Sequence, residues 1–397
     1  MPVHRPSLGR PARAIVAAAL VLLLLGAGAW LVSLRAPEPV VELPSHSRTI
    51  GAVHFGGPDR PPGALRSLLL QKVRSAPPGS TIDWATYYFL DRELAQALIG
   101  ASDRGVKVTL VVEGDPRLKG ANDPALDLLK RHGLRGALTV RAPRAFPPGR
   151  LSGKLHSKIY AFSAPEPVAL VGSYNPSDGG FADSATIREI GDQDRGHNLL
   201  VEIVSPALAA TLTAHVRRLA GRGGEANRFS KAQNRTYADR DTQLYFYPRL
   251  RPNVVERTVD SLGQGDRLWA AVSHLKDDAV DTLAKAAARG AKLHLVVHDT
   301  ERRVPEAAVR KLTKAGVSVR RYRHPDGLPM HSKFFLLQRG DERVSYFGSL
   351  NFNQNSRLLN EEVLIRSTDP ALFGTLLRRF RRIEAETEGA PPAALAA

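Results

Sequence analysis

The chain has 397 residues, 43% of them hydrophobic, which suffices for one large or two medium globular domains with a buried core. It contains no cysteine, and this excludes disulfides, thiolate catalysis and cysteine-ligated zinc. The formal net charge is +17, which favours anionic partners such as nucleic acid, anionic lipid or a cell-wall polymer. A GC-rich genome, whose codons often specify arginine, would produce the same excess of positive charge.

The first predicted element is an apolar N-terminal helix. Three arginines precede an uncharged run at residues 14–34, and these 21 residues are about the length that spans a bilayer. The basic flank is expected to stay in the cytoplasm and to place the rest of the chain outside. Residues 1–36 are therefore predicted to be a signal anchor in the cell membrane, or a signal peptide whose cleavage at residues 27–29 releases a secreted protein. A Pro-rich tether at residues 37–47 follows.

After the tether, the chain is predicted to run twice through one pattern of strand, helix, strand, helix and strand. The first pass has strands at 52–55, 81–89 and 106–112 and helices at 63–76 and 91–104. The second has strands at 243–247, 267–274 and 292–297 and helices at 253–262 and 277–289. This alternation predicts an α/β fold with two mixed-sheet halves, each flanked by helices.

Matching landmarks in the two passes indicate a duplication. Trp84 and Trp269 are 185 residues apart, and so are Arg104–Gly105 and Arg289–Gly290, where glycine is expected to end a helix. The predicted organisation is half 1 at residues 48–221, a polar linker at 222–241, half 2 at 242–388 and an Ala/Pro-rich tail at 389–397. Because one chain supplies both halves, a monomer is expected.

A histidine-x-lysine pair occurs twice, at His156–Lys158 and at His331–Lys333, each time at the start of an apolar, strand-like run. A Gly-Ser-x-Asn turn follows each copy, at Gly172–Asn175 and at Gly348–Asn351. Because side chains alternate along a strand, a histidine and a lysine two residues apart point to the same face. Two such pairs facing each other would bring two histidines and two lysines to one phosphate, as attack on a phosphodiester requires.

These paired motifs on a duplicated α/β scaffold resemble the phospholipase D superfamily, and the resemblance covers roughly residues 48–385. It implies a duplicated phospholipase D-like sandwich that acts as a metal-independent phosphodiesterase without a cofactor. The implied catalytic residues are His156, Lys158, Asn175, His331, Lys333 and Asn351, and the implied supporting residues are Ser173, Ser349 and Glu362.

The resemblance implies a division of labour, with His156 attacking phosphorus to form a phosphohistidine and His331 protonating the leaving oxygen. The sequence itself does not distinguish the two histidines. The lysines would neutralise the non-bridging oxygens, while the asparagines and serines would donate hydrogen bonds to them. Glu362 would orient one histidine through its far ring nitrogen. No metal is needed on this interpretation.

The chain departs from the family pattern at the aspartate that usually follows each histidine by seven residues. Ser163 and Gln338 stand at these positions. In this family the aspartate is thought to support the site rather than to make bonds. Its loss is therefore expected to affect rate and stability more than the type of reaction.

A second departure concerns the Asn-x-Glu sequence that the family places after the GSxN turn. The second copy has it at Asn360–Glu362. The first copy has Asn198, then Leu200 at the position of the glutamate, with Glu202 two residues further along the same strand face. This departure leaves the tuning of His156 open.

Other charged residues are given weaker predictions. His54 and His274 end predicted strands that point at the cleft, and Glu113 and Asp299 follow the valine-rich strands at matching sites, so all four are candidates for the mouth of the cleft. The last helix, at residues 371–388, contains four arginines that are expected to form a solvated basic face.

The leading functional hypothesis is phospholipase D-type hydrolysis of phospholipid head groups at a membrane surface, or transfer of the phosphatidyl group to an alcohol. Choline and ethanolamine are the head groups considered first. One alternative is a nuclease that acts on DNA or RNA, which the charge of +13 outside the four N-terminal arginines favours. The other is a catalytically degenerate phosphate- or lipid-binding protein, which the missing aspartates suggest.

Overall fold

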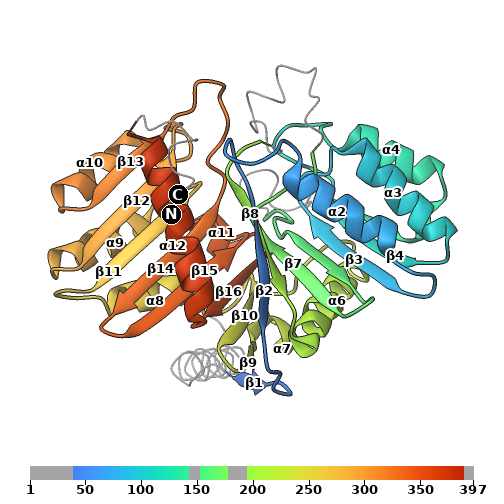
Figure 1. The fold of residues 1–397 in the computed structure, drawn as a ribbon, viewed down its shortest axis with the longest axis horizontal. Coiled ribbons are helices and arrows are strands. Elements are labelled where there is room, and N and C mark those ends of the chain that lie inside the picture. Colours follow the sequence, from blue (N-terminus) through green and yellow to red (C-terminus); the bar gives the residue numbers. More distant parts are fainter. Residues whose placement is uncertain (1–38, 143–152, 178–194, 389–397) are drawn as a thin grey trace, which may run out of the picture. The chain divides into compact units, whose positions relative to one another are not determined.

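The computed structural model describes residues 39–142, 153–177 and 195–388 (Figure 1). From Val40 onward these residues belong to one compact unit. The predicted anchor or signal peptide at residues 1–36 and the predicted tail at 389–397 lie outside the described residues. Across the described ranges, no helix combines the length and the apolar character that crossing a bilayer demands.

The first half contains a seven-stranded mixed sheet in the order β2-β8-β7-β6-β3-β4-β5. Its strands are β2 (Ile50–Gly56), β3 (Thr81–Thr86), β4 (Lys107–Glu113), β5 (Leu138–Arg141), β6 (Ile159–Phe162), β7 (Val168–Gly172) and β8 (Asn198–Ile203). Its helical segments are α2 (Ala64–Ser75), α3 (Arg92–Asp103), α4 (Asp123–Arg131), the 3-10 helix η1 (Leu134–Gly136) and α6 (Pro206–Ala220).

The second half contains a nine-stranded mixed sheet in the order β1-β9-β10-β16-β15-β14-β11-β12-β13. Its strands are β1 (Val40–Glu42), β9 (Thr236–Asp239), β10 (Thr242–Tyr247), β11 (Arg267–Val272), β12 (Lys292–His298), β13 (Ser318–Tyr322), β14 (Lys333–Arg339), β15 (Glu342–Gly348) and β16 (Glu362–Ser367). Its helices are α7 (Lys231–Asn234), α8 (Val254–Asp260), α9 (Asp278–Ala288), α10 (Glu306–Lys314), α11 (Gln354–Leu358) and α12 (Pro370–Glu386).

The duplication that the sequence predicts is confirmed by the strand order. The last seven strands of the second sheet, β10-β16-β15-β14-β11-β12-β13, repeat the order of the first sheet strand for strand. In the first half β3 runs parallel to β4 and antiparallel to β6, the strand that follows the histidine-lysine motif. In the second half β11 runs parallel to β12 and antiparallel to β14 in the same way. The fold is therefore a duplicated α/β fold with two mixed sheets.

The predicted equivalence of Trp84 and Trp269 is wrong by one residue. In the first half, Trp84 lies opposite Tyr160, which is two residues after Lys158. In the second half, Phe335 is two residues after Lys333, and Ala270 lies opposite it. The counterpart of Trp84 is therefore Ala270. Because side chains alternate along a strand, this shift puts the two indoles on opposite faces of their sheets. Trp84 packs with the outer helices α2 and α3, and Trp269 packs in the core that the two halves share.

The segments expected to be a tether and a linker both contribute strands. β1, in the predicted tether, runs parallel to β9, in the predicted linker, with Val40 opposite Thr236 and Glu42 opposite Ala238. The consecutive valines in β1 favour an extended backbone, and the unpaired edge of β9 supplies the hydrogen-bonding partners. The chain is therefore joined to the second sheet before it enters the first.

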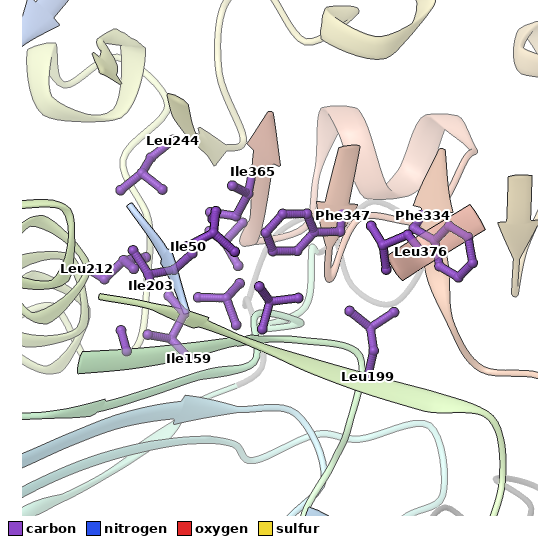
Figure 2. Packing of buried hydrophobic residues seen from close by; sticks show 14 of the residues in the cluster. Ile50, Ile159, Leu199, Ile203, Leu212, Leu244, Phe334, Phe347, Ile365 and Leu376 are labelled. Carbon is purple, nitrogen blue, oxygen red and sulfur yellow. The ribbon is translucent and has the colours of Figure 1, made fainter. Parts of the chain in front are cut away.

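One hydrophobic cluster joins the halves (Figure 2). Ile50, Ile159 and Leu199 of the first sheet belong to the same buried cluster as Phe334 and Phe347 of the second, and α6 and α12 add Leu212 and Leu376. Two further clusters bury the other faces of the sheets, under α2, α3 and α4 in the first half and under α8, α9 and α10 in the second. Each fully buried side chain of this kind contributes about 1.5–3 kcal/mol, so the shared cluster fixes one half against the other.

Candidate active site

Backbone pairing between the halves places the two motifs. Leu155 forms a bridge with Glu361, and the His156 amide donates to the Glu361 carbonyl at 2.9 Å. The matching bridge joins His197 to Met330, and the His331 amide donates to the His197 carbonyl at 2.9 Å. Each histidine-lysine motif is therefore held by the other half of the molecule.

A cavity of about 220 Å³ lies between the motifs. Four of the six predicted catalytic residues line it: His156, Asn175, His331 and Asn351. The two lysines are buried beside it, at the starts of β6 and β14. The ammonium of Lys158 donates to the carbonyl of His156 at 2.6 Å, and that of Lys333 donates to the carbonyl of His331 at 2.7 Å. Each lysine is therefore fixed to the backbone of its own histidine.

Glu362 of the second half holds His156 of the first. The His156 Nδ1–H donates to Glu362 Oε2 at 2.8 Å, which leaves Nε2 as the reactive nitrogen. The carboxylate is fully buried, and it also accepts hydrogen bonds from Ser349 Oγ at 2.5 Å, Ser356 Oγ at 2.7 Å and Asn360 Nδ2 at 3.1 Å. This network fixes both the rotation and the tautomer of the His156 ring.

Asn198 of the first half holds His331 of the second. The His331 Nδ1–H donates to Asn198 Oδ1 at 3.0 Å, and Ser173 Oγ donates to the same oxygen at 3.0 Å. Ser173 and Ser349, which the sequence suggested as phosphate ligands, thus bind the two groups that orient the histidines. The two halves use the same geometry with different chemistry, a carboxylate for His156 and a neutral amide for His331.

The interpretation that Leu200 replaces the missing glutamate is wrong by two residues. Gly172 lies opposite Leu200, and Gly348 lies opposite Leu364, so the counterpart of Glu362 is Asn198. Leu200 is fully buried in the outer core of the first half. The pairing of β7 with β8 is needed to show that Asn198, and not Leu200, occupies the position of Glu362.

Glu202 lies outside the site. Its carboxylate is 3.4 Å from His54 Nε2 and 3.1 Å from Lys72 Nζ. Hydrogen bonds from these two side chains lower the pKa of Glu202 to about 2. His54 therefore faces Glu202 and does not line the cavity, contrary to the expectation for the end of its strand.

The cavity disfavours protonation of its own bases. Burial, together with the nearby lysines, lowers the pKa of His156 to about 4, although the Glu362 carboxylate opposes the shift. Burial lowers the pKa of Lys158 to about 7 and places the pKa values of His331 and Lys333 well below their ordinary values. Burial alone would raise the pKa of Glu362, but His156 and Lys158 keep it below its usual range. A bound anion would reverse these shifts, because it stabilises every cationic form around it.

The two asparagines present their amides to the cavity. Asn175 Oδ1 accepts from the Tyr88 amide at 3.3 Å, which leaves the NH₂ group of Asn175 to donate to a ligand. Asn351 Oδ1 is buried and has no hydrogen-bond partner within the described part of the chain. The NH₂ group of Asn175 is thus placed to donate to a phosphate oxygen, whereas Asn351 Oδ1 would accept a hydrogen bond from a ligand.

Ser163 and Gln338, which replace the usual aspartates, lie far from the histidines. Each is five residues beyond its lysine along the strand, roughly 16 Å at about 3.3 Å per residue. Ser163 Oγ accepts from the Thr81 amide at 2.8 Å, and Gln338 Nε2 donates to the Gly340 carbonyl at 3.3 Å. These positions therefore act on the outer ends of β6 and β14.

Several cavity residues were not predicted from the sequence. They are Tyr87, Tyr88, Arg117, Lys154, Arg302, Arg303 and Asn360. Most follow the carboxyl ends of parallel strands, where ligands bind in α/β sheets. Their position after these strands was the feature of the sequence that could have identified them. His274, which follows β11, does line the cavity as suggested.

Glu113 and Asp299 were candidates for the mouth of the cleft, and neither is among the cavity residues. Glu113 is fully buried, and its carboxylate binds Arg141 Nη1 at 2.9 Å and the Leu155 amide at 2.6 Å. Asp299 instead pairs with His298 at 2.5 Å. In the ranges that the structure describes, no group of three His, Asp or Glu side chains is arranged to hold a metal ion.

Comparisons with known proteins identify a family and a fold that the chain shares. The family model described as "Cardiolipin synthase, PLD-like domain" matches residues 69–220 and 261–384, one segment in each half. A search of curated proteins finds no match.

Two solved structures show the same fold. Phosphatidylserine synthase from Haemophilus influenzae Rd KW20 is 13% identical, and the match covers 85% of this chain and 88% of that one with a TM-score of 0.58. Polyphosphate kinase from Porphyromonas gingivalis is 15% identical and matches 84% of this chain with a TM-score of 0.54. The match covers 49% of the kinase chain, so this chain spans about half of its length.

Proposed function

The chain belongs to the phospholipase D superfamily, and from that premise we propose that it cleaves phosphodiesters through a phosphohistidine on His156. The observation that carries the proposal is that both histidines line one cavity, with a buried lysine beside each. Each half supplies one histidine and the group that orients the histidine of the other half. One phosphate between them would meet a nucleophile, a proton donor and two cations.

The reaction has two steps. In the first, His156 Nε2 bonds to phosphorus, the bond from phosphorus to the leaving oxygen breaks, and His331 gives that oxygen a proton. In the second, an acceptor hydroxyl gives its proton to His331 and bonds to phosphorus, and the bond to Nε2 breaks. The bound phosphate raises the pKa of His331 from its low ligand-free value, which allows the ring to carry the proton that it donates.

The different partners of the histidines support His156 as the nucleophile. A phosphohistidine bonded through Nε2 carries positive charge on its ring, which a carboxylate stabilises better than a neutral amide does. Glu362 supplies that carboxylate to His156 at 2.8 Å, whereas His331 has only the amide of Asn198.

The proposed substrate is a phospholipid, and the proposed overall reaction is transfer of its phosphatidyl group to an alcohol, with hydrolysis when water is the acceptor. The matching family model is described as a cardiolipin synthase domain, which supports both the lipid substrate and the transfer reaction. We also propose that the apolar N-terminal segment places the catalytic unit at the outer surface of the cell membrane, where such lipids are abundant.

A nuclease is the second candidate, and the charge favours it. The chain carries a net charge of +17, and four cationic side chains line the cavity, namely Arg117, Lys154, Arg302 and Arg303. A polynucleotide would satisfy the same phosphate contacts, and its binding would weaken steeply with salt.

The test uses the purified full chain in excess EDTA, with vesicles of phosphatidylglycerol, phosphatidylethanolamine or phosphatidylcholine and, separately, with single-stranded DNA. Phosphatidic acid and lipids formed with added glycerol or ethanol are measured beside the His156→Ala variant. The proposal predicts EDTA-resistant products from lipid that the variant does not make. Product from DNA alone would support the nuclease, and no product from any phosphodiester would refute the proposed activity.

A further inference from the structure

The two walls of the cavity differ although their motifs match. On the first-half wall, the ring centroid of Tyr87 is 5.2 Å from that of His156, and Tyr88 packs against Tyr87 at 4.5 Å. On the second-half wall, His274 and two arginines take the corresponding place beside His331. The first-half wall also contains Arg117 and Lys154, and Lys154 pairs with Asp115 at 2.6 Å. The walls therefore differ in their aromatic residues and in the burial of their cations, because Arg303 of the second-half wall, here called the basic wall, is buried.

Arg303 is the buried cation of the basic wall. Its side chain is 6% exposed, and its Nη1 donates to Ser273 Oγ at 3.2 Å. Its backbone is fixed as well, because the Leu275 amide donates to the Arg303 carbonyl at 3.2 Å. β11 and β12 are parallel, so their carboxyl ends bring Ser273 and Arg303 to the edge of the sheet where ligands bind.

Arg303 acts electrostatically on the catalytic groups of its own half. Burial is the main cause of the lowered pKa of Lys333, and Lys158 and Arg303 add to it. The pKa of His274, on the same wall, is lowered by burial and then by Arg303. His274 Nδ1 is buried and has no hydrogen-bond partner among the described residues. Among the described residues that line the cavity there is no aspartate or glutamate.

The in-line geometry of the proposed reaction indicates which part of the substrate lies against the basic wall. In an in-line displacement the nucleophile and the leaving oxygen lie on opposite sides of phosphorus. With His156 attacking, the leaving alcohol departs on the side of His331 and the basic wall. The acceptor alcohol enters from the same side, because the second step reverses the first.

We propose that Arg303, with Arg302 at the rim, forms a second anion subsite that binds a phosphate carried by the leaving or entering alcohol. The proposal rests on the proposed function and specifies its substrate class, a phosphodiester whose arm beyond His331 bears another phosphate. A guanidinium matches two phosphate oxygens with parallel hydrogen bonds. A choline or ethanolamine head group would instead bring a cation against Arg303, so these head groups are disfavoured.

The first test measures binding without turnover. Calorimetry compares inorganic phosphate with methylenediphosphonate, which carries two linked anionic groups, on the full chain and on Arg303→Met and Lys311→Met. Lys311 lies on the outer helix α10 and pairs with Asp281, so Lys311→Met is the control that removes the same charge elsewhere. The wild type and the control are expected to bind the diphosphonate about tenfold more tightly than phosphate, and Arg303→Met should lose this advantage. Equal affinities in the wild type, or an advantage that survives in Arg303→Met, would overturn the subsite.

The second test measures turnover on matched pairs. Phosphatidylglycerol is compared with phosphatidylglycerol phosphate, and thymidylyl-thymidine with the same dinucleotide bearing a terminal phosphate. In the wild type, kcat/KM should be about tenfold higher for the phosphate-bearing member of one pair, and in Arg303→Met the ratio should fall toward one. The pair that shows the preference distinguishes a lipid from a nucleic acid.

Failure of the subsite and failure of the proposed function give different results. If phosphodiesters are cleaved without any preference for a second phosphate, the subsite is wrong and the function stands. If bis(4-nitrophenyl) phosphate and both pairs remain uncleaved, the proposed function is wrong, and the calorimetry still decides whether the second anion binds at Arg303.

Discussion

At the residue scale, the two histidines of the cavity are equivalent in position and unequal in chemistry. His156 donates to a buried carboxylate, and His331 donates to an amide oxygen. The carboxylate stabilises a positive ring, while the amide fixes orientation and allows the ring to take up and release a proton easily. In the proposed mechanism, this inequality divides the roles of nucleophile and proton carrier between two copies of one motif.

The first prediction concerns the residues that orient the histidines. Glu362→Gln should lower kcat by about 10²–10⁴-fold, because it removes the charge that stabilises the phosphohistidine and permits the wrong tautomer. Asn198→Ala should cost less, about 10–100-fold, since it removes only orientation. Steady-state kinetics on one phosphodiester measures both effects. Glu202→Gln is the control, because Glu202 lies outside the cavity and pairs with His54 and Lys72. A near-wild-type rate for Glu362→Gln would contradict the assignment.

The second prediction concerns protons. The pKa of Lys158 is about 7 in the empty cavity, so near pH 7.5 much of this lysine is neutral. A bound sulfate raises that pKa and acts in the same direction on Lys333 and the two histidines, whose pKa values are also lowered, so binding should take up one or more protons near neutral pH. Calorimetry in buffers of different ionisation enthalpy measures the uptake. Lys158→Met should reduce it, and proton release by the wild type would show that the direction is wrong.

The sequence identified the two histidines that line the cavity and the buried lysine of each motif, because their spacing is regular and repeated. It related the missing first-half glutamate to His156, whereas Asn198, which stands at that position, binds His331, because the register of β7 against β8 sets its place. It also assigned the two serines to phosphate, although their hydroxyls bind Asn198 and Glu362. Roles that depend on which side chain lies across a strand could not be predicted from one sequence.

At the element scale, α12 connects the halves through buried charge. Arg379 is 3% exposed, and its Nη1 donates to both carboxylate oxygens of Asp59 at 2.9 and 2.8 Å. Its Nη2 donates to His197 Nδ1 at 2.8 Å, and His197 Nε2 donates to Glu386 at 2.8 Å. His197 precedes Asn198 and accepts the His331 amide on its carbonyl, so this network lies directly behind the second catalytic histidine.

The expectation of a solvated basic face on the last helix is therefore wrong for part of the helix. Arg379 is buried, and Arg382 Nε lies 3.0 Å from Asp59, whereas Arg378 and Arg381 are exposed. The helix and its extent were predictable from its periodicity. Its acidic partner, Asp59, is 320 residues away from Arg379 in the sequence, so no local pattern predicted their pairing.

The third prediction follows from this network. Arg379→Met should lower the free energy of unfolding by about 3–5 kcal/mol, because it leaves the buried Asp59 carboxylate without its main partner. Arg378→Met, on the exposed side of the same helix, should change it by less than about 0.5 kcal/mol. Urea denaturation followed by circular dichroism measures both variants. Equal stability of the two variants would mean that the buried pair does not hold the halves together.

At the scale of the whole molecule, duplication explains why a single chain can hold a complete site. Seven strands in one order occur twice, and the hydrophobic cluster that contains Ile50 and Phe334 joins the two copies. The repeated sequence pattern predicted this architecture, since a repeat of scaffold and motif together leaves few alternatives. The difference between the two walls of the cavity was not predictable, because it resides in loops that the repeat does not constrain.

The most direct test of the central claim is to locate the covalent intermediate. The full chain carrying His331→Asn is incubated with a ³²P-labelled phosphodiester in EDTA, quenched under alkaline conditions that preserve phosphohistidine, and mapped by peptide mass spectrometry. The substrate carries a 4-nitrophenolate leaving group, which departs without a proton from His331, so loss of the proton carrier slows mainly the second step. The label should then accumulate on the peptide that contains His156 and should be absent when His156→Ala is added. Label on any other residue, or catalysis that EDTA abolishes, would contradict a metal-independent reaction in which His156, held by Glu362, attacks phosphorus.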